Sequence, residues 1–436
     1  MKPVLWDDIR LAVAMTKRGE IPDPQRIEAA RRGLAVFRRM PVPLQRLREF
    51  LEVRQFRVEG EEADLMVRIA YGNLLASLGR RHPRVALQRF ARQSRDAVRR
   101  SSFELRNPFL WGGFELQGLE HLRSSAARGR GLFVVSFHVG PYRFIPLELA
   151  QLGFEVEVVV DQKGMDRETL MHRVAVALRR HASAEAQSQW GHWRADVIDR
   201  LHVINAETAD VALQIVRALR QGRVVMVYLD GNTGAGQRKA EHVREVPFFD
   251  TRIQVRAGVG EIAATVKAPI VLALARRSWV RRHQCRFGAS IAPSAGEGRA
   301  AFADRVLREL IGGLERRLAA HPGDWEEWHH LHRMQDPPAA EAPAVPDVEG
   351  AGAPSRLWVD SYRAFAFSAA HAHYVFEPER RQFVTVDDVT ARIVRALYRP
   401  RRTATLAAAF TAAHGSDAVA QAMAQVRSRG WAEPVS

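Results

Sequence analysis

The chain has 436 residues, 47% of them hydrophobic, which is enough for two domains or for one large domain and a small one. Its 65 Lys and Arg against 49 Asp and Glu give a net charge of +16, which suits an acidic partner: nucleic acid, an anionic membrane surface, an acidic carrier protein or a phosphorylated substrate. The single cysteine, Cys285, excludes an internal disulfide and a cysteine-rich metal site, and no run of about 18 uncharged apolar residues predicts a membrane span.

The N-terminal residues include Asp7 and Asp8 and lack the apolar core of a secretory signal, so we expect a cytoplasmic protein. Peripheral contact with a membrane face remains open. The positive charge has an equally simple alternative explanation, an arginine-rich surface that is solvated and binds nothing.

Residues 1–110 contain helical patterns and short connectors, and they predict a helical cap of the main domain. From residue 111 onward, short apolar runs alternate with helical segments, which is typical of a parallel sheet. We therefore expect residues 111–335 to form an α/β domain, a mostly parallel sheet covered by helices. The predicted strands are 132–137, 154–160, 201–204, 224–229 and 270–275.

The last part of the chain predicts a separate unit. Residues 336–354 are rich in Pro, Ala and Gly without an apolar period, which indicates a linker. Residues 355–436 then show short strands and three helices, at 387–398, 403–414 and 417–428. This layout predicts a small winged-helix-like domain.

One stretch, residues 131–143, combines a buried strand with a histidine. The apolar run Leu132–Phe137 ends at His138, Gly140 and Pro141 follow, and the next apolar positions have helical spacing. Open α/β sheets bind ligands at the carboxyl ends of their strands. A helix beginning near Gly140 would offer backbone N–H groups to an oxyanion. The alternative is that His138 only caps or packs this turn.

Polar residues follow two other predicted strands. Asp161 closes the strand at 154–160 and Asp230 the strand at 224–229. The glycine-rich loop 231–240 contains Arg238 and Lys239, which would hold a phosphate or, alternatively, lie on a mobile surface loop. The spacing of three histidines at 329–332 does not favour a metal site.

Several ordered blocks resemble the lipid A late acyltransferases, of the lysophospholipid acyltransferase group. The sequence GRGLFVVSFHVG at 129–140 is similar to the first motif of that family, and LQGLEHL at 116–122 fits its lead-in. Further blocks are VMVYLD at 225–230, EVPFFD at 245–250, and a closing set comprising Pro322, Trp325, Trp328, His332 and Arg333. The agreement extends over residues 110–334.

This resemblance implies an acyltransferase that moves a fatty acyl group from an acyl thioester, acyl-CoA or acyl carrier protein, to a hydroxyl acceptor. It implies His138 as general base. By the same comparison and the chain pattern, we expect Gly140, Tyr142, Arg238, Lys239, Phe248, Phe249 and Arg333 to contact substrate. The acyl donor is a substrate, and no cofactor or metal is expected.

The family places a carboxylate five residues after its histidine, where this chain has Arg143. The carboxylate would fix the imidazole tautomer, and a guanidinium would disfavour the imidazolium. Three interpretations remain open. Asp161 or Asp230 replaces the carboxylate, with Glu148 a more distant choice; Arg143 binds an oxyanion or phosphate; or the domain has lost activity and binds a ligand only.

Residues 355–436 resemble the PqqD-like peptide-recognition domains in layout, from the short strands to Gly430, Trp431, Ala432 and Glu433. The resemblance implies a leader peptide that adds a strand to the sheet. A winged helix that binds DNA is the less favoured alternative. The sequence thus predicts an acyltransferase with a hydroxyl or amine acceptor, including a ribosomally made peptide; the alternative is a non-catalytic protein that binds peptide, lipid or nucleic acid.

Overall fold

The computed structural model describes residues 44, 61–106, 113–161, 197–231, 242–278, 282–335, 356–369 and 372–435. These residues form two compact units. The first unit contains the described parts of 1–57, 96–246 and 254–326, and the second contains the described parts of 58–95, 247–253 and 327–436. We describe each unit by itself.

The first unit is built on a mostly parallel sheet. Within the described residues its strand order is β1-β9-β8-β2-β5-β3-β4, and the β8–β9 pair alone is antiparallel. This confirms the predicted mostly parallel α/β sheet. The strands, in chain order, are β1 (Phe114–Gln117), β2 (Leu132–Ser136), β3 (Val156–Val160), β4 (Leu201–Asn205), β5 (Val224–Tyr228), β8 (Ile270–Arg276) and β9 (His283–Phe287).

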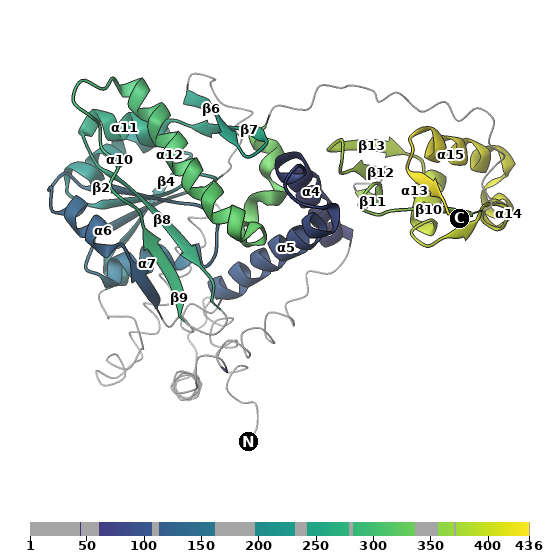
Figure 1. Ribbon diagram of the computed structural model, residues 1–436, viewed down its shortest axis with the longest axis horizontal. Helices are drawn as coiled ribbons and strands as arrows, with labels where there is room; N and C mark the ends of the chain where they lie inside the picture. The colour runs from purple at the N-terminus through teal and green to yellow at the C-terminus, as the bar shows by residue number, and fades with distance from the viewer. Residues whose placement is uncertain are drawn as a thin grey trace. The chain divides into compact units, whose positions relative to one another are not determined.

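Helices lie on both faces of this sheet (Figure 1). Leu132 and Val134 of β2 join a core with buried residues of α6 and α7, whereas Gly313 of α12 approaches Leu272, whose side chain points to the opposite face. Burial on both faces explains why the central strands are continuous apolar runs. The helices are α6 (Leu119–Ala126), α7 (Ile145–Gln151), α10 (Val211–Arg220), α11 (Gly258–Val266) and α12 (Arg299–Ala320).

Two elements cross the division between the units. The helix α5 (Arg84–Arg106) begins in the second unit and ends in the first. The strands β6 (Val243–Phe248) and β7 (Thr251–Arg256) pair with each other, and the tip of this hairpin, 247–253, belongs to the second unit.

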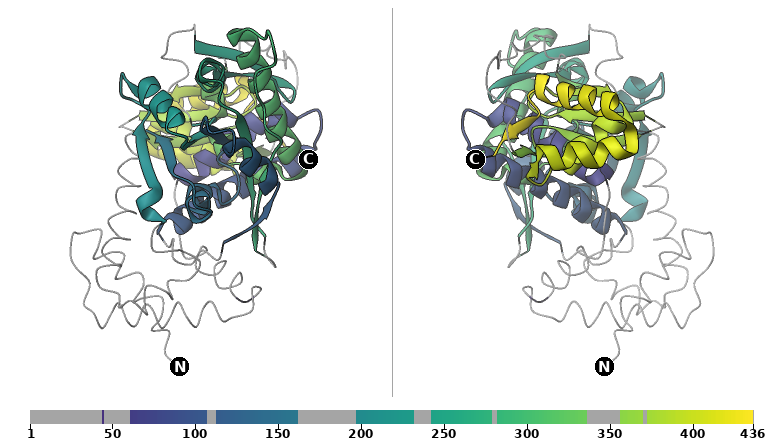
Figure 2. Two further views of the ribbon diagram at one scale, coloured as in Figure 1. Left: turned by 90° about the vertical axis from the view of Figure 1, so that its left-hand side faces the viewer. Right: turned by 90° about the vertical axis from the view of Figure 1, so that its right-hand side faces the viewer.

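In the second unit a small antiparallel sheet, β11-β12-β13, is covered on both faces. The helix α4 (Glu61–Leu78) packs Leu65 and Ile69 against Phe365, Phe367 and Phe376 of this sheet. A core around Val375 and Val386 fills the other face, below the C-terminal helices coloured yellow in Figure 2. The strands are β11 (Phe365–Ala369), β12 (Ala372–Glu377) and β13 (Gln382–Val386), and the helices are α13 (Asp388–Ala396), α14 (Thr403–His414) and α15 (Ser416–Ser428).

A second small sheet joins distant parts of the same unit, in the order β14-β10-β15. Its strands are β10 (Arg356–Val359), β14 (Arg401–Arg402) and β15 (Ala432–Pro434). The predicted short strands and three helices of 355–436 are therefore present. The expected domain limits differ at the other end, because α4 and the first half of α5, predicted within the cap 1–110, group with the second unit. The predicted linker 336–354 lies outside the described residues.

Candidate active site

The sheet register brings His138 and Asp230 together. The strands β2 and β5 are parallel neighbours, with Ser136 opposite Tyr228 at their carboxyl ends. His138 follows Ser136 by two residues, and Asp230 follows Tyr228 by two. Equal offsets from a matched pair place both side chains at the same edge of the sheet, where α/β proteins bind their ligands.

The Asp230 carboxylate holds His138 through both oxygens. Nδ1 of His138 lies 2.8 Å from Oδ1, and the backbone N–H of His138 donates to Oδ2 at 2.9 Å. The indole Nε1 of Trp325 donates to the same Oδ2 at 2.7 Å. A carboxylate only accepts, so Nδ1 donates the proton and Nε2 is the basic nitrogen of the ring. We call this pair the His138–Asp230 dyad.

The two members of the dyad differ in exposure. The Asp230 side chain is 1% exposed, whereas that of His138 is 20% exposed. A buried carboxylate that is hydrogen-bonded on both oxygens can fix the ring and stabilise its positive charge, and an imidazole that reaches solvent can exchange protons with a bound molecule.

Two aromatic rings pack against the imidazole of His138. The ring centroids of Tyr142 and Tyr228 lie 4.7 and 5.2 Å from that of His138. A Cβ on Gly231 would lie 3.0 Å from the carbonyl oxygen of Tyr228 and at an ordinary van der Waals distance, 3.9 Å, from Cε1 of His138, so the glycine relieves a backbone contact beside the ring. Tyr142, expected to contact substrate, is instead buried beside the ring, because its hydroxyl is directed to Glu326 at 3.3 Å.

Asp230 occupies the position that the sequence left open between two aspartates. Asp161 follows β3, and β5 lies between β3 and β2 in the sheet. Glu148 is buried in α7, on the side of Cys285. The contact to Nδ1 of His138 therefore comes from the strand next to β2.

Arg143 lies against Tyr142, the tyrosine that packs on His138, so its contact with an oxyanion or a phosphate stays a prediction. Its guanidinium lies 4.8 Å from the centroid of the Tyr142 ring, and its buried Nε has no hydrogen-bond partner among the described residues. Burial lowers the pKa of Arg143, but Tyr142 and Glu326 outweigh burial and the net pKa is raised. Arg143 is thus a cation held within a protein environment close to the dyad.

Gly140 serves a different purpose from the one predicted. Helical structure does begin near Gly140, with the 3₁₀ helix η2 (Tyr142–Phe144) that leads into α7 from Ile145, but Gly140 itself precedes it. Its N–H donates to the carbonyl of Asp324 at 3.4 Å. The residue has φ +67°, and a Cβ there would lie 2.5 Å from the carbonyl oxygen of Ala275. Glycine is required because this turn passes close to the end of β8.

The other predicted contact residues belong to the second unit or lie outside the described residues. Phe248, Phe249 and Arg333 belong to the second unit. There Phe248 is fully buried, 4.9 Å from Phe249 and 6.0 Å from Trp328 between ring centroids, and Arg333 is exposed. The structure thus places Phe248 in a packed core. Arg238 and Lys239 lie outside the described residues.

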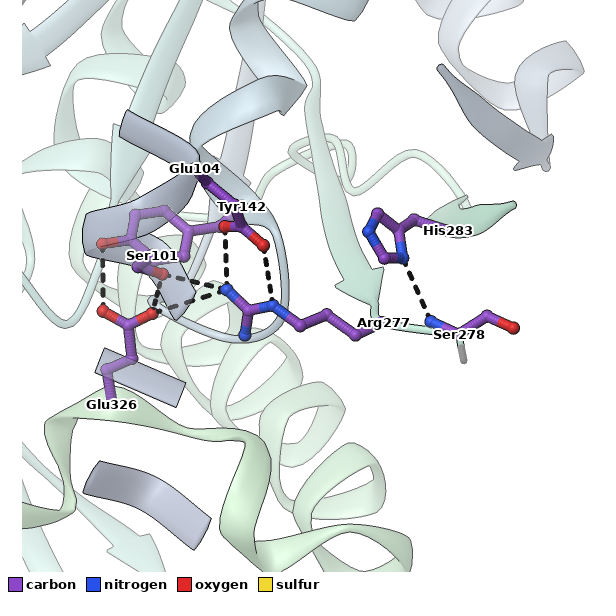
Figure 3. A network of polar contacts seen from close by, with 7 residues as sticks. All are labelled: Ser101, Glu104, Tyr142, Arg277, Ser278, His283 and Glu326. Carbon is purple, nitrogen blue, oxygen red and sulfur yellow. Dashed lines mark hydrogen bonds and ion pairs between the residues drawn. The ribbon is translucent and has the colours of Figure 1, made fainter. Parts of the chain in front are cut away.

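A buried network of charges next to the dyad was not found from the sequence (Figure 3). Arg277, just after β8, donates to both oxygens of Glu104, at 2.9 Å each, and to Ser101 Oγ at 3.0 Å. Ser101 Oγ also contacts Glu326, and Tyr142 joins from the other side. The residues come from four distant segments without a shared motif, so spacing gave no signal.

In the part of the chain that the structure describes, no group of three or more His, Cys, Asp or Glu side chains has the geometry to hold a metal ion. In the same part, no helix combines the length and the apolar character that crossing a bilayer would need.

Comparison with known proteins adds no relative. No protein-family model matches this chain, and no curated protein sequence matches it. The resemblance noted in the sequence therefore remains a prediction, and the function has to be argued from the chemistry of the site.

Proposed function

We propose that this protein is an acyltransferase that moves a fatty acyl group from a thioester, of coenzyme A or acyl carrier protein, to a hydroxyl or amine acceptor. The observation that supports it most is the His138–Asp230 dyad at the carboxyl ends of two adjacent parallel strands. The blocks that resemble the lipid A late acyltransferases contribute both residues of this dyad.

The proposed chemistry needs one base. Nε2 of His138 takes the proton of the acceptor O–H or N–H while the acceptor atom attacks the thioester carbonyl carbon. The carbon–sulfur bond then breaks, the imidazolium returns the proton to the departing thiolate, and a free thiol and an ester or amide remain. Asp230 holds the tautomer and stabilises the imidazolium in between.

The net charge of +16 supports an acidic donor, since coenzyme A carries phosphates and carrier proteins are acidic. Both donors occur in the cytoplasm, so we propose that the protein acts there. A lipid acceptor would add contact with a membrane face.

A peptide acceptor is supported by the second unit. The strand β13 lies at an edge of its sheet, and Phe383 on it is 51% exposed. An edge strand offers unpaired backbone groups to an added strand, and an exposed aromatic ring offers a contact for its side chains. We therefore propose peptides alongside lysophospholipids as acceptor classes.

The test measures thioester turnover in the full chain. Long-chain acyl-CoA is incubated with lysophospholipid or with a peptide bearing Ser and Lys; released thiol is titrated and acceptors are weighed by mass spectrometry. The only cysteine, Cys285, is buried, so the folded protein adds little thiol background. We expect His138→Gln to lower kcat by about 100-fold or more, because a positioned base typically contributes that much.

His121→Gln is the matched control, since that histidine is on α6, is 43% exposed and lies outside the dyad. It should retain wild-type turnover. Transfer that survives in His138→Gln would remove the proposal. Binding of peptide, vesicles or an oligonucleotide by a wild-type protein that leaves every thioester intact would support the non-catalytic alternative instead.

A further inference from the structure

Glu326 connects the dyad to the buried charge network. It directly follows Trp325, whose indole holds Asp230, and its own backbone N–H donates to the carbonyl of His138 at 3.0 Å. Its side chain is nearly fully buried. Two consecutive residues therefore contact both members of the dyad.

The Glu326 carboxylate has three polar neighbours. Ser101 donates to Oε1, Tyr142 donates to Oε2 at 3.3 Å, and Nη2 of Arg277 lies 3.9 Å from Oε1 (Figure 3). Arg277 already has a closer counter-ion, because Glu104 accepts two hydrogen bonds from it. The charge of Glu326 is therefore not needed to neutralise Arg277.

Arg143 forms no ion pair within 4.0 Å among the described residues. Its guanidinium stacks on one side of the Tyr142 ring, and the hydroxyl of the same ring reaches Glu326. Burial prevails and raises the pKa of Glu326, and Arg143 is the strongest of the groups that limit this rise. The reverse also holds, since Glu326 contributes to the raised pKa of Arg143. Each group thus favours the charged form of the other, and both contact Tyr142; we call this mutual effect the charge balance of Glu326 and Arg143.

This balance matters for His138. When the imidazole takes a proton, a new positive charge forms at a ring that packs on Tyr142, and Arg143 already places one on that tyrosine. A nearby cation disfavours the imidazolium, and a nearby anion favours it. Asp230 supplies one negative charge, and Glu326 supplies the second.

We propose that Glu326 is a positioning residue of the reaction: its carboxylate offsets the charge of Arg143 and so keeps His138 able to take a proton. The role of Glu326 in a reaction rests on the proposed function, but its electrostatic effect on the His138 imidazole can be measured without turnover. It also explains how an arginine is tolerated where the resembled family has a carboxylate.

The charged and titratable groups around His138 and Glu326 come from several elements. His138 contacts Asp230 after β5, Tyr228 at the end of β5 and Tyr142 after β2. Around Glu326 and Arg277 the groups are Arg143, Glu104, Arg100 and Asp324, and burial together with Arg277 lowers the pKa of Arg100 to about 10.

The experiment follows the His138 imidazole directly. Histidine is labelled with ¹³C at Cε1, the His138 signal is assigned by its loss in His138→Gln, and its titration is recorded in the full chain. In Glu326→Gln we expect the midpoint to move to lower pH by up to about one unit, the size of a typical charge effect at short range. Arg143→Met should move it to higher pH, and the double variant should return it close to wild type.

Two matched controls separate charge from structure. Glu157→Gln removes another buried carboxylate, which lies on β3 and pairs with Arg223, and this variant should leave the His138 midpoint in place. Tyr142→Phe removes the hydrogen bond to Glu326 but neither charge, so its shift should be smaller than that of Glu326→Gln.

An unchanged midpoint in Glu326→Gln, or an equal shift in Glu157→Gln, would overturn the inference. If Glu326→Gln does not fold, Arg143→Met tests the inference by itself. A His138 midpoint that does not rise in Arg143→Met would contradict the charge balance. A wild-type protein without thioester turnover would refute the proposed function, while the titration still decides the inference. In an active enzyme, the acid limb of the kcat/KM profile should move with the midpoint.

Discussion

Asp230 accepts from a backbone N–H, an imidazole and an indole, and this set predicts how its amide variant behaves. The oxygen of Asn can keep the two donors on Oδ2, Trp325 Nε1 and the His138 N–H. Its NH2 group then points at Nδ1, which must accept, and the ring proton moves to Nε2. Asp230→Asn should therefore fold but lower kcat by about 10³–10⁴-fold, because the base carries its proton on the wrong nitrogen.

Asp161→Asn is the comparison for this prediction, since the sequence offered both aspartates. It changes a half-buried residue after β3, and turnover should stay within a few-fold of wild type. Steady-state kinetics on both variants, with circular dichroism to check folding, decide between them. A larger loss of turnover in Asp161→Asn than in Asp230→Asn would show that Asp161, and not Asp230, orients the imidazole.

At this scale the sequence predicted His138 and narrowed its partner to two strand-end carboxylates. It could not choose between them, because the choice depends on β5 lying between β2 and β3. Strand order is set by long-range packing and is absent from local periodicity. Glu326 and Arg277 were missed for the same reason, as their partner Ser101 is distant in the chain.

The turn after β2 gives a prediction at the level of an element. Gly140 and Gly129 have nearly the same φ, +67° and +69°, but a Cβ on Gly140 would lie 2.5 Å from Ala275 O, whereas nothing lies within 4 Å of one on Gly129. Gly129→Ala should cost about 1–2 kcal/mol of unfolding free energy, from the left-handed backbone alone. Gly140→Ala should cost about 1–3 kcal/mol more, because the turn must move away from β8.

Urea unfolding of the two alanine variants measures this difference. Equal losses would mean that the turn relaxes freely and that Gly140 is needed only for its φ. A larger loss in Gly129→Ala would contradict the packing of this turn against the end of β8.

Among the elements, the apolar runs that became β2, β3, β5 and β8 were predictable, since each is buried in the sheet. The strand β9 was not, because His283, Gln284, Cys285, Arg286 and Phe287 form a mostly polar sequence. Its signal is an alternation, with the first, third and fifth residues buried. Such an alternation is short enough to occur by chance, and only pairing with β1 and β8 stabilises it as a strand.

At the scale of the whole molecule, the division into units could not be read from the order of segments. The sequence separated 355–436 by its linker and placed residues 1–110 with the main domain. The structure instead packs α4 against the aromatic face of β11–β13, because Leu65 and Ile69 cover Phe365, Phe367 and Phe376 there. Packing between this helix and this sheet depends on the complementarity of two surfaces that are distant in the chain. The sequence of either segment alone does not predict it.

The second unit contains a histidine whose burial makes stability depend on pH. Burial, followed by the charges of Arg333 and Arg381, lowers the pKa of His332 from 6.5 to about 4. Above pH 6.5 the imidazole is neutral in the folded and unfolded chains alike. As the pH falls from 6.5 toward 4, the unfolded chain binds a proton that the folded chain excludes, so the unfolding free energy decreases, by at most on the order of 3 kcal/mol.

His332→Gln removes this titration while keeping an amide beside Asn73, whose Nδ2 lies 3.4 Å from the histidine Nδ1. The unfolding free energy of both proteins is measured in urea at several pH values between 7 and 4.5. The difference between the two proteins removes the contribution of the carboxylates, because these titrate in both. We expect wild type to lose more unfolding free energy than His332→Gln as the pH falls, and His121→Gln, changed in the first unit, to follow wild type. Parallel curves for wild type and His332→Gln would contradict the prediction, because the folded chain would then bind the proton without cost despite the burial of the imidazole and the charges of Arg333 and Arg381.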